Sequence, residues 1–160
     1  MAASSVPDER TPPAPTSAAD LCNCLALRKA ARYLTAAYDN EFAAVGLRAT
    51  QFSILQQLSA HGEMTITDLA QISAVDRTTM ATNLKLLARR NLVAIEPSAT
   101  DRRARIVTLT ADGRARFTDA LPLWRAAQSR FEESFGSGKA ADLRAALNGV
   151  LDTGFDPWAE

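Results

Sequence analysis

Apolar side chains near the start of the chain recur with the spacing of an amphipathic helix. From Asp20, a candidate helix cap, they fall at intervals of three and four residues: Leu27, Ala31, Leu34, Tyr38 and Phe42. This interval places them on one face of a helix, which Gly46 is expected to end. A second helix is expected to end near Gly62, and its inward positions have similar spacing: Phe52, Leu55 and Leu58.

The middle of the chain predicts two short helices joined by a tight turn. Thr65, with Asp68 three residues later, is typical of a capping box at the start of the first. Residues 73–75 form the turn, and Asp76 is a candidate cap for the second. The second short helix has an apolar face and a polar face. Its inward positions are Met80, Leu84 and Leu87, and its outward positions are Arg77, Thr78, Thr79, Thr82, Asn83 and Lys85.

Two strand-forming runs follow the short helices. Residues 92–96 and 105–109 are rich in β-forming side chains, and a polar connection at 97–104 separates them. A β-hairpin is the simplest interpretation. Two short helices and a hairpin outline a winged helix-turn-helix, which is a DNA-reading module. The second short helix is then the recognition helix, and the hairpin tip is the wing.

The remaining residues predict two further helices. Thr110 is a candidate cap for a long helix, and Gln128 is the single polar residue on the apolar face of that helix. Pro122 is expected to bend this helix or to break it locally. A final helix follows Gly138. The inward positions of the two helices are Phe117, Leu121, Trp124, Phe131, Phe135, Leu143, Ala146, Leu147, Val150 and Leu151.

These elements predict a mainly α-helical α+β protein, namely a winged helix-turn-helix flanked by helices that form a dimerisation region. Residues 1–19 hold four of the seven prolines and are expected to be a disordered tail. We assign residues 20–46 and 111–152 to dimerisation, because these helices are too apolar to stand alone, and residues 47–110 to DNA binding. Two-fold symmetry would place two recognition helices about 34 Å apart on a pseudo-palindromic site.

The charge of the chain is balanced overall but uneven along its length. Its 160 residues carry no net charge, yet seven basic and three acidic side chains lie between Asp76 and Arg105. A local basic face on a neutral protein suits contact with phosphates. No apolar run approaches the roughly 20 residues of a membrane-spanning helix, and a secretion signal is missing. We therefore expect a cytoplasmic protein without a membrane partner, whose cysteines are thiols.

The sequence lacks the motifs on which enzymes rely. It has no phosphate-binding glycine loop, no nucleophile elbow and no metal-ligand cluster, and His61 is its one histidine. We expect no catalytic residue, no metal and no cofactor. The alternative to a DNA-binding protein is a winged helix that binds another protein. Such a protein would not need the threonine-rich helix face or the wing arginines.

Several segments resemble the MarR family, over about residues 21–151. They are residues 46–52, the two short helices, residues 91–93 and, above all, residues 101–110, with the sequence DRRARIVTLT. The resemblance implies a homodimeric transcriptional regulator, usually a repressor, that a small ligand or thiol oxidation releases from double-stranded DNA. It implies that Arg103 enters the minor groove, with Asp101 holding its guanidinium or bracing the wing. The outward positions of the recognition helix are candidate DNA contacts. The candidate DNA contacts of the wing are Asp101, Arg102, Arg103 and Arg105.

Cys22 and Cys24 are the only cysteines, and they lie at the head of the first predicted helix. Within a helix about 200° would separate them, so they would neither share a metal nor easily form a disulfide. If Asn23 caps the helix, Cys24 lies in the first turn, where backbone N–H groups favour a thiolate. The two cysteines are candidate sensors of oxidants or electrophiles. The alternative is that they are small residues packed in a dimer interface.

Residues 24–27 also resemble the peroxide-sensing region of the organic-hydroperoxide regulators within that family. The tyrosines that hold the reactive sulfur in those regulators correspond here to Arg28, Ala49 and Phe52. Arg28 can instead stabilise a thiolate by charge or hold the carboxylate of a ligand. The second sensing hypothesis is therefore a small aromatic or carboxylate effector between the terminal helices and the DNA-binding domain. Its candidate lining is Arg28, Arg32, Tyr38 and Trp124.

Overall fold

The computed structural model describes residues 17–19, 21–101 and 103–154. The predicted cap at Asp20, the wing contact at Arg102 and most of the predicted N-terminal tail therefore lie outside the described residues. The chain divides into two compact units, Met1–Leu34 and Thr35–Glu160, and each is considered by itself. No helix in the described part has the length and hydropathy needed to cross a bilayer.

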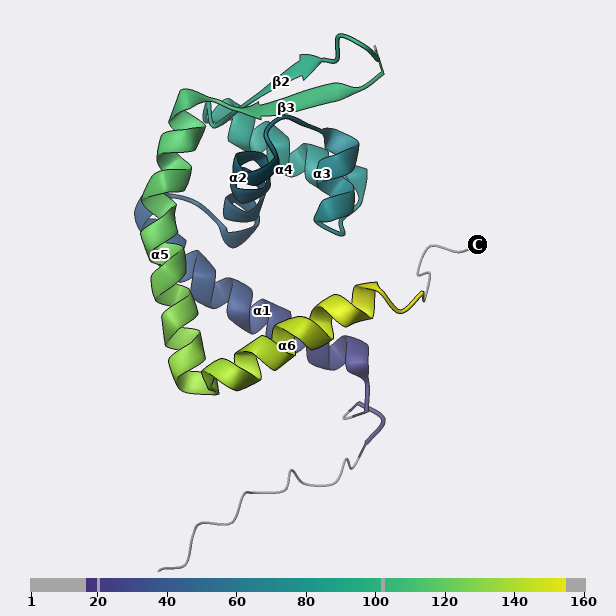
Figure 1. Cartoon of the computed structure of the whole chain (residues 1–160), viewed down its shortest axis with the longest axis vertical. Coiled ribbons are helices and arrows are strands. Elements are labelled where there is room, and N and C mark those ends of the chain that lie inside the picture. Colours follow the sequence, from purple (N-terminus) through teal and green to yellow (C-terminus); the bar gives the residue numbers. More distant parts are fainter. Residues whose placement is uncertain (1–16, 20, 102, 155–160) are drawn as a thin grey trace, which may run out of the picture. The chain divides into compact units, whose positions relative to one another are not determined.

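The elements follow one another in the order of a winged helix-turn-helix with helical extensions at both ends (Figure 1). They are α1 (Asn23–Phe42), the 3-10 helix η1 (Ala43–Val45), α2 (Ala49–His61), β1 (Met64–Thr65), α3 (Ile66–Ile72), α4 (Arg77–Arg89), β2 (Val93–Pro97), β3 (Arg105–Leu109), α5 (Ala111–Phe135) and α6 (Ser137–Leu151). The predicted fold class, mainly helical with a small antiparallel sheet, is confirmed.

Local side-chain chemistry sets the helix ends that the sequence predicts. Asp68 N–H donates to Thr65 Oγ1 at 3.0 Å, and Thr65 N–H donates to Asp68 Oδ2 at 3.4 Å, which completes the capping box of α3. The hydroxyl of Thr110 accepts a hydrogen bond from Gly113 N–H at 2.9 Å and caps α5. Gly46 ends η1 with φ +66°, in the left-handed region that favours glycine.

The sheet has three strands, one more than the predicted hairpin. The central strand β3 pairs antiparallel with β2, where Ile95 lies opposite Val107, and with β1, where Met64 lies opposite the same residue. Sequence patterning missed β1 because two residues are too few to show an alternation. Val107 is fully buried, so the middle of the sheet belongs to the core.

The core of the second unit is centred on Phe52 of α2. Its ring stacks on Phe42 with the centroids 4.6 Å apart, and it lies 5.5 Å from Phe117 and 6.5 Å from Trp124. These four rings join the end of α1, α2 and α5. Aromatic pairs at such separations stabilise a core beyond the area that they bury. The same core also contains the buried residues Leu55, Leu69, Met80, Leu84, Leu87 and Val107.

Helix α5 is continuous through Pro122. The predicted local break therefore does not occur, and Figure 1 shows one gently curved ribbon. The start of α5 packs directly on backbone: a Cβ added at Gly113 would lie 1.9 Å from the carbonyl oxygen of Leu92, just before β2. This close approach ties the long helix to the base of the wing.

Candidate nucleic-acid interface

Asp76 fixes the first turn of α4, the predicted recognition helix. Its carboxylate accepts hydrogen bonds from the Thr79 hydroxyl at 2.6 Å and from Thr79 N–H at 2.8 Å. These bonds hold the pKa of Asp76 below its ordinary value, and the bond from the hydroxyl has the largest effect. The carboxylate also lies at the positive end of the helix dipole. The predicted cap is confirmed, and the N-terminus of α4 is held in place by the chain itself.

Helix α4 divides its side chains between the core and an outer face. Met80, Leu84 and Leu87 are buried. On the opposite side, four exposed side chains follow one another at intervals of three or four residues and so share a face: Thr78, Thr82, Lys85 and Arg89. Three of these are among the predicted contacts. The surface therefore combines short hydroxyl side chains with two positive charges.

Two of the predicted outward residues lie on the flank of α4 that faces α2. Thr79 and Asn83 line a small cavity of about 200 Å³ together with Thr50 and Ser53 of α2. The Thr79 hydroxyl is engaged by Asp76, and Asn83 Nδ2 donates to the Thr79 carbonyl at 3.1 Å. The Thr82 hydroxyl makes a similar bond to the Thr78 carbonyl at 3.0 Å, so it is their position beside α2 that separates Thr79 and Asn83 from the stripe of Thr78, Thr82 and Lys85. Arg77, at the first turn, is exposed.

A network of hydrogen bonds, most of them from backbone N–H groups to side-chain oxygens, shapes the wing. Ser98 Oγ accepts hydrogen bonds from Thr100 N–H and Asp101 N–H, each at 3.3 Å. Asp101 Oδ1 accepts one from Arg103 N–H at 2.8 Å, and Ala104 N–H donates to the Asp101 carbonyl at 3.0 Å. Of the two roles predicted for Asp101, the structure shows the bracing of the turn. The side chain of Arg103 is exposed on this braced turn, and that of Arg105, the first residue of β3, is exposed next to it.

Arg90 belongs to the basic surplus that the sequence shows, but it has an internal role. Its Nη1 donates to the Gly46 carbonyl at 2.7 Å. Arg116 of α5 donates likewise to the Val45 carbonyl. The two guanidinium groups thus join the end of η1 to the end of α4 and to α5. The sequence does not indicate that Arg90 has a different role from its neighbour Arg89. The roles differ because α4 ends at Arg89, and Arg90 follows as the cap of the helix.

The candidate sensing residues Cys22, Cys24 and Arg28 lie in the first unit, and all three are exposed. Ala26 N–H donates to the Cys22 carbonyl at 3.0 Å, and Leu25 N–H donates to Cys22 Sγ at 3.4 Å. Cys22 therefore occupies the N-cap position, and the assumption that Asn23 caps the helix is wrong, since Asn23 is already helical. In the described part of the chain, no group of three or more His, Cys, Asp or Glu is placed to hold a metal.

Tyr38 and Trp124, proposed from the sequence to line an effector cleft, both have partners within the second unit. The Tyr38 hydroxyl donates to Gln128 Oε1, which explains the one polar step on the apolar face of α5. Partial burial raises the pKa of Tyr38, and the charge of Glu132 raises it further. The indole of Trp124 packs beside Phe52 in the core.

The fold, with an exposed polar face on α4 and a basic wing, defines a winged helix-turn-helix protein. Residues 45–104 match the model of the MarR family. The chain is 30% identical over 127 residues to the HTH-type transcriptional repressor NicR of Pseudomonas putida, a match that covers 79% of this chain and 80% of NicR. The protein belongs to the MarR family. It is thus a transcriptional regulator rather than an enzyme, as the sequence predicts.

Two solved structures illustrate the similarity. The transcriptional regulator MosR of M. tuberculosis, in complex with DNA, is 37% identical with a TM-score of 0.68, covering 81% of this chain and 98% of MosR. The transcriptional repressor CouR, bound to a 23-mer DNA duplex, is 27% identical with a TM-score of 0.75, covering 82% of this chain and 93% of CouR.

Proposed function

We propose that this protein is a homodimeric, sequence-specific DNA-binding repressor. In this proposal α4 enters the major groove of a pseudo-palindromic operator, and residues 47–110 form the DNA-binding domain. The observation that carries it is the exposed stripe of Thr78, Thr82 and Lys85 on a helix whose N-terminus Asp76 already orders. Hydroxyl groups bond base edges or phosphates, and lysine bonds guanine or phosphate. The DNA complexes of MosR and CouR support this reading.

The wing supplies the minor-groove contact in this proposal. Arg103 is exposed beside a turn that Asp101 and Ser98 brace. A planar guanidinium with a permanent charge suits a narrow and electronegative groove. Because the turn is already ordered, less conformational entropy is lost when Arg103 docks. Arg77, Arg105 and, outside the described residues, Arg102 provide further contacts to the backbone of the duplex.

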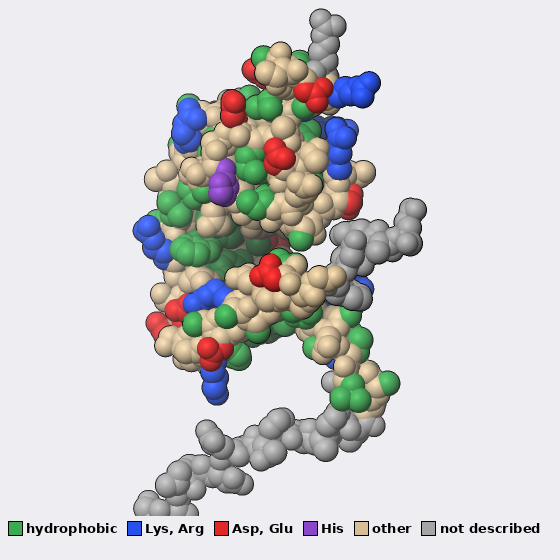
Figure 2. Space-filling view, turned by 45° about the vertical axis from the view of Figure 1, so that its right-hand side comes forward, with side chains coloured by type: hydrophobic (Ala, Val, Ile, Leu, Met, Phe, Trp, Pro, Cys, Tyr) green, Lys and Arg blue, Asp and Glu red, His purple; other side chains and the backbone are tan. Residues whose placement is uncertain are grey.

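The exposed apolar side chains of the terminal helices support a homodimer. Phe135, Leu147 and Val150 are exposed in the single chain. Figure 2 also shows apolar side chains in the hollow above α6. Surface of this kind marks an interaction site, and two-fold association would set two copies of α4 on one face of the duplex. We therefore keep residues 20–46 and 111–152 as the dimerisation region. Sedimentation should give twice the chain mass of 17.2 kDa.

Release from DNA is proposed to follow oxidation of Cys22 or Cys24. Both thiols are exposed, and the N–H of Leu25 points at Cys22 Sγ. Oxidants modify sulfur atoms that they can reach, and the hydrogen bond from Leu25 holds the exposed Cys22 Sγ in a fixed place at the start of α1. The alternative signal is a small aromatic or carboxylate effector held by Arg28. Since the target is chromosomal DNA, the proposed site of action is the cytoplasm.

The decisive experiment measures binding to the intergenic duplex upstream of the gene, with a scrambled duplex of equal length as control. Reduced protein should bind the first duplex tightly, and affinity should fall steeply with added salt because phosphate contacts release counterions. Peroxide should then lower the affinity reversibly. Binding that ignores the oxidant would shift the search to small effectors. No salt-sensitive binding to either duplex would favour the alternative, a winged helix that binds protein.

A further inference from the structure

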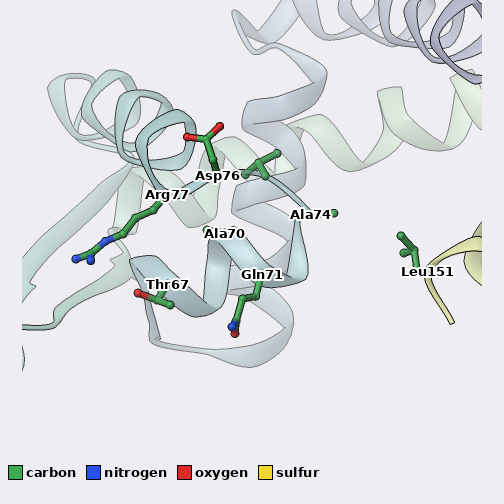
Figure 3. Close-up of a pocket in the computed structure, with 8 residues that line it drawn as sticks. Thr67, Ala70, Gln71, Ala74, Asp76, Arg77 and Leu151 are labelled. Atoms are coloured by element: carbon green, nitrogen blue, oxygen red, sulfur yellow. The ribbon is translucent and has the colours of Figure 1, made fainter. Parts of the chain in front are cut away.

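A groove of about 580 Å³ lies between the helix-turn-helix and the end of α6. One wall consists of Ala70 and Gln71 of α3, followed by Ala74 and Val75 in the turn. Leu151, the last residue of α6, faces this wall across the open space (Figure 3). At the start of α4 the groove is bounded by Asp76, whose carboxylate is held by Thr79, and by Arg77, whose side chain extends away from Leu151 in the same view.

The groove is apolar and uncovered in the single chain. Val75 is 37% exposed and Leu151 is 73% exposed, although both are large aliphatic residues. Aliphatic side chains on two facing elements would lose contact with water if a further apolar group lay between them. The groove therefore suits an occupant that brings apolar side chains and can also meet the positive charge of Arg77.

Residues 155–160 of the chain itself, FDPWAE, have this chemistry. This segment, called the tail segment below, carries two aromatic rings, Phe155 and Trp158, and two acidic side chains, Asp156 and Glu160. Its connection begins at the groove, because only four positions separate Phe155 from Leu151, a span of at most roughly 14 Å. Gly154, just before it, has φ +70°, the left-handed conformation that lets a chain change direction.

We infer that the tail segment binds in this groove, with Phe155 and Trp158 against Ala74 and Val75 and with Glu160 near Arg77. The order of side chains along the tail segment matches the order along the groove. The aromatic residues come first, beside the aliphatic wall, and Glu160 comes last, beyond the turn. A carboxylate at the first turn of α4 competes with DNA phosphate for Arg77. The tail segment is thus a weak internal inhibitor of DNA binding.

The docking is tested first without DNA, by the fluorescence of Trp158. The chain has two tryptophans, so each protein is paired with a version of itself that also carries Trp158→Phe. Subtracting the spectrum of that version leaves the emission of Trp158 alone. The docked indole should emit at shorter wavelength than a solvated one and resist quenching by acrylamide. Val75→Ser should abolish both effects, whereas Ile72→Ser, at a residue that is 46% exposed but outside the groove, should not. A fully solvated Trp158 in the parent protein overturns the inference.

A mixing experiment distinguishes the chain's own tail segment from that of a second copy. Chains that lack residues 155–160 but keep an intact groove are mixed with full-length Val75→Ser chains. Protection of Trp158 in the mixture would show that the tail segment docks on a neighbouring chain, which overturns binding within one chain. Trp158 that stays solvated in the mixture, and protected in the parent, supports the inference.

The effect on DNA rests on the function proposed above, and it is measured separately. Deletion of residues 155–160 should raise operator affinity roughly two- to five-fold at low salt, the size expected of an exposed ion pair. Glu160→Gln should give part of this gain, and Asp142→Asn, an exposed acid of α6 outside the groove, should give none. If the tail segment docks but its deletion does not raise operator affinity, the proposed inhibition is overturned. Absence of DNA binding by every variant refutes the proposed function but leaves the fluorescence result intact.

Discussion

Replacement of Gly113 by alanine should destabilise the protein, although it improves the helix propensity of α5. The added Cβ would lie 1.9 Å from the Leu92 carbonyl oxygen and 2.9 Å from the carbonyl carbon. The obstacle is backbone, and it is held in place, because the Leu92 oxygen accepts a hydrogen bond from Thr110 N–H at 3.3 Å. Relief requires α5 to move away from the base of the wing by about an ångström, which would loosen the Thr110 cap and the packing of Leu109.

The magnitude follows from two opposing terms. Overpacking of a dense core costs about 1–3 kcal/mol or more, and the rigid backbone places Gly113→Ala at the upper end. Exchange of glycine for alanine within a helix returns about 1 kcal/mol. We expect the free energy of unfolding to fall by about 2 kcal/mol. Gly149→Ala in α6 is the matched control, because a Cβ there meets nothing within 4 Å, and it should raise stability by about 0.5–1 kcal/mol.

The assay is urea unfolding of the three proteins at one protein concentration, since association would make stability depend on concentration. The midpoint should move down for Gly113→Ala and up for Gly149→Ala, with the slope of the free energy against urea unchanged. If Gly113→Ala were as stable as the parent, the close approach between α5 and Leu92 would be refuted. Loss of stability in both variants would instead contradict the role given to the clash.

Three further predictions concern DNA binding and its control. Arg103→Ala should weaken operator binding by about 1–3 kcal/mol in an anisotropy titration, and unchanged affinity would refute its place in the minor groove. Arg89→Gln should reduce the slope of log affinity against log salt concentration by about one. Arg90→Gln should weaken binding but leave that slope unchanged, because the Arg90 guanidinium is held at the Gly46 carbonyl. Equal losses of slope in the two variants would contradict this assignment. After peroxide, Cys22→Ser protein should stay on DNA while Cys24→Ser protein dissociates; release of the double variant would end the redox hypothesis.

Local signals explain why much of the fold could be predicted. The caps at Thr65, Asp76 and Thr110 each depend on a partner three residues away, so a reading of neighbouring positions finds them. The start of α2 has a partner of each kind: Arg48 N–H donates to Gln51 Oε1 at 3.1 Å, three positions away, whereas Ala49 N–H donates to Asp39 Oδ1 at 2.7 Å, across ten positions of sequence. Such a partner is set by how α1 and α2 pack, and nothing in the local sequence announces it.

The same distinction applies to the candidate site. The polar side of α4 could be recognised from its period, but the period does not say what lies beside each polar residue. Packing against α2 leaves Thr79 and Asn83 on a flank, where they line a small cavity with Thr50 and Ser53. The surface that remains open to a base edge is therefore narrower than the sequence predicts. The proposed sequence preference then rests on Thr78, Thr82 and Lys85, which lie on a helix whose first turn is held by Asp76.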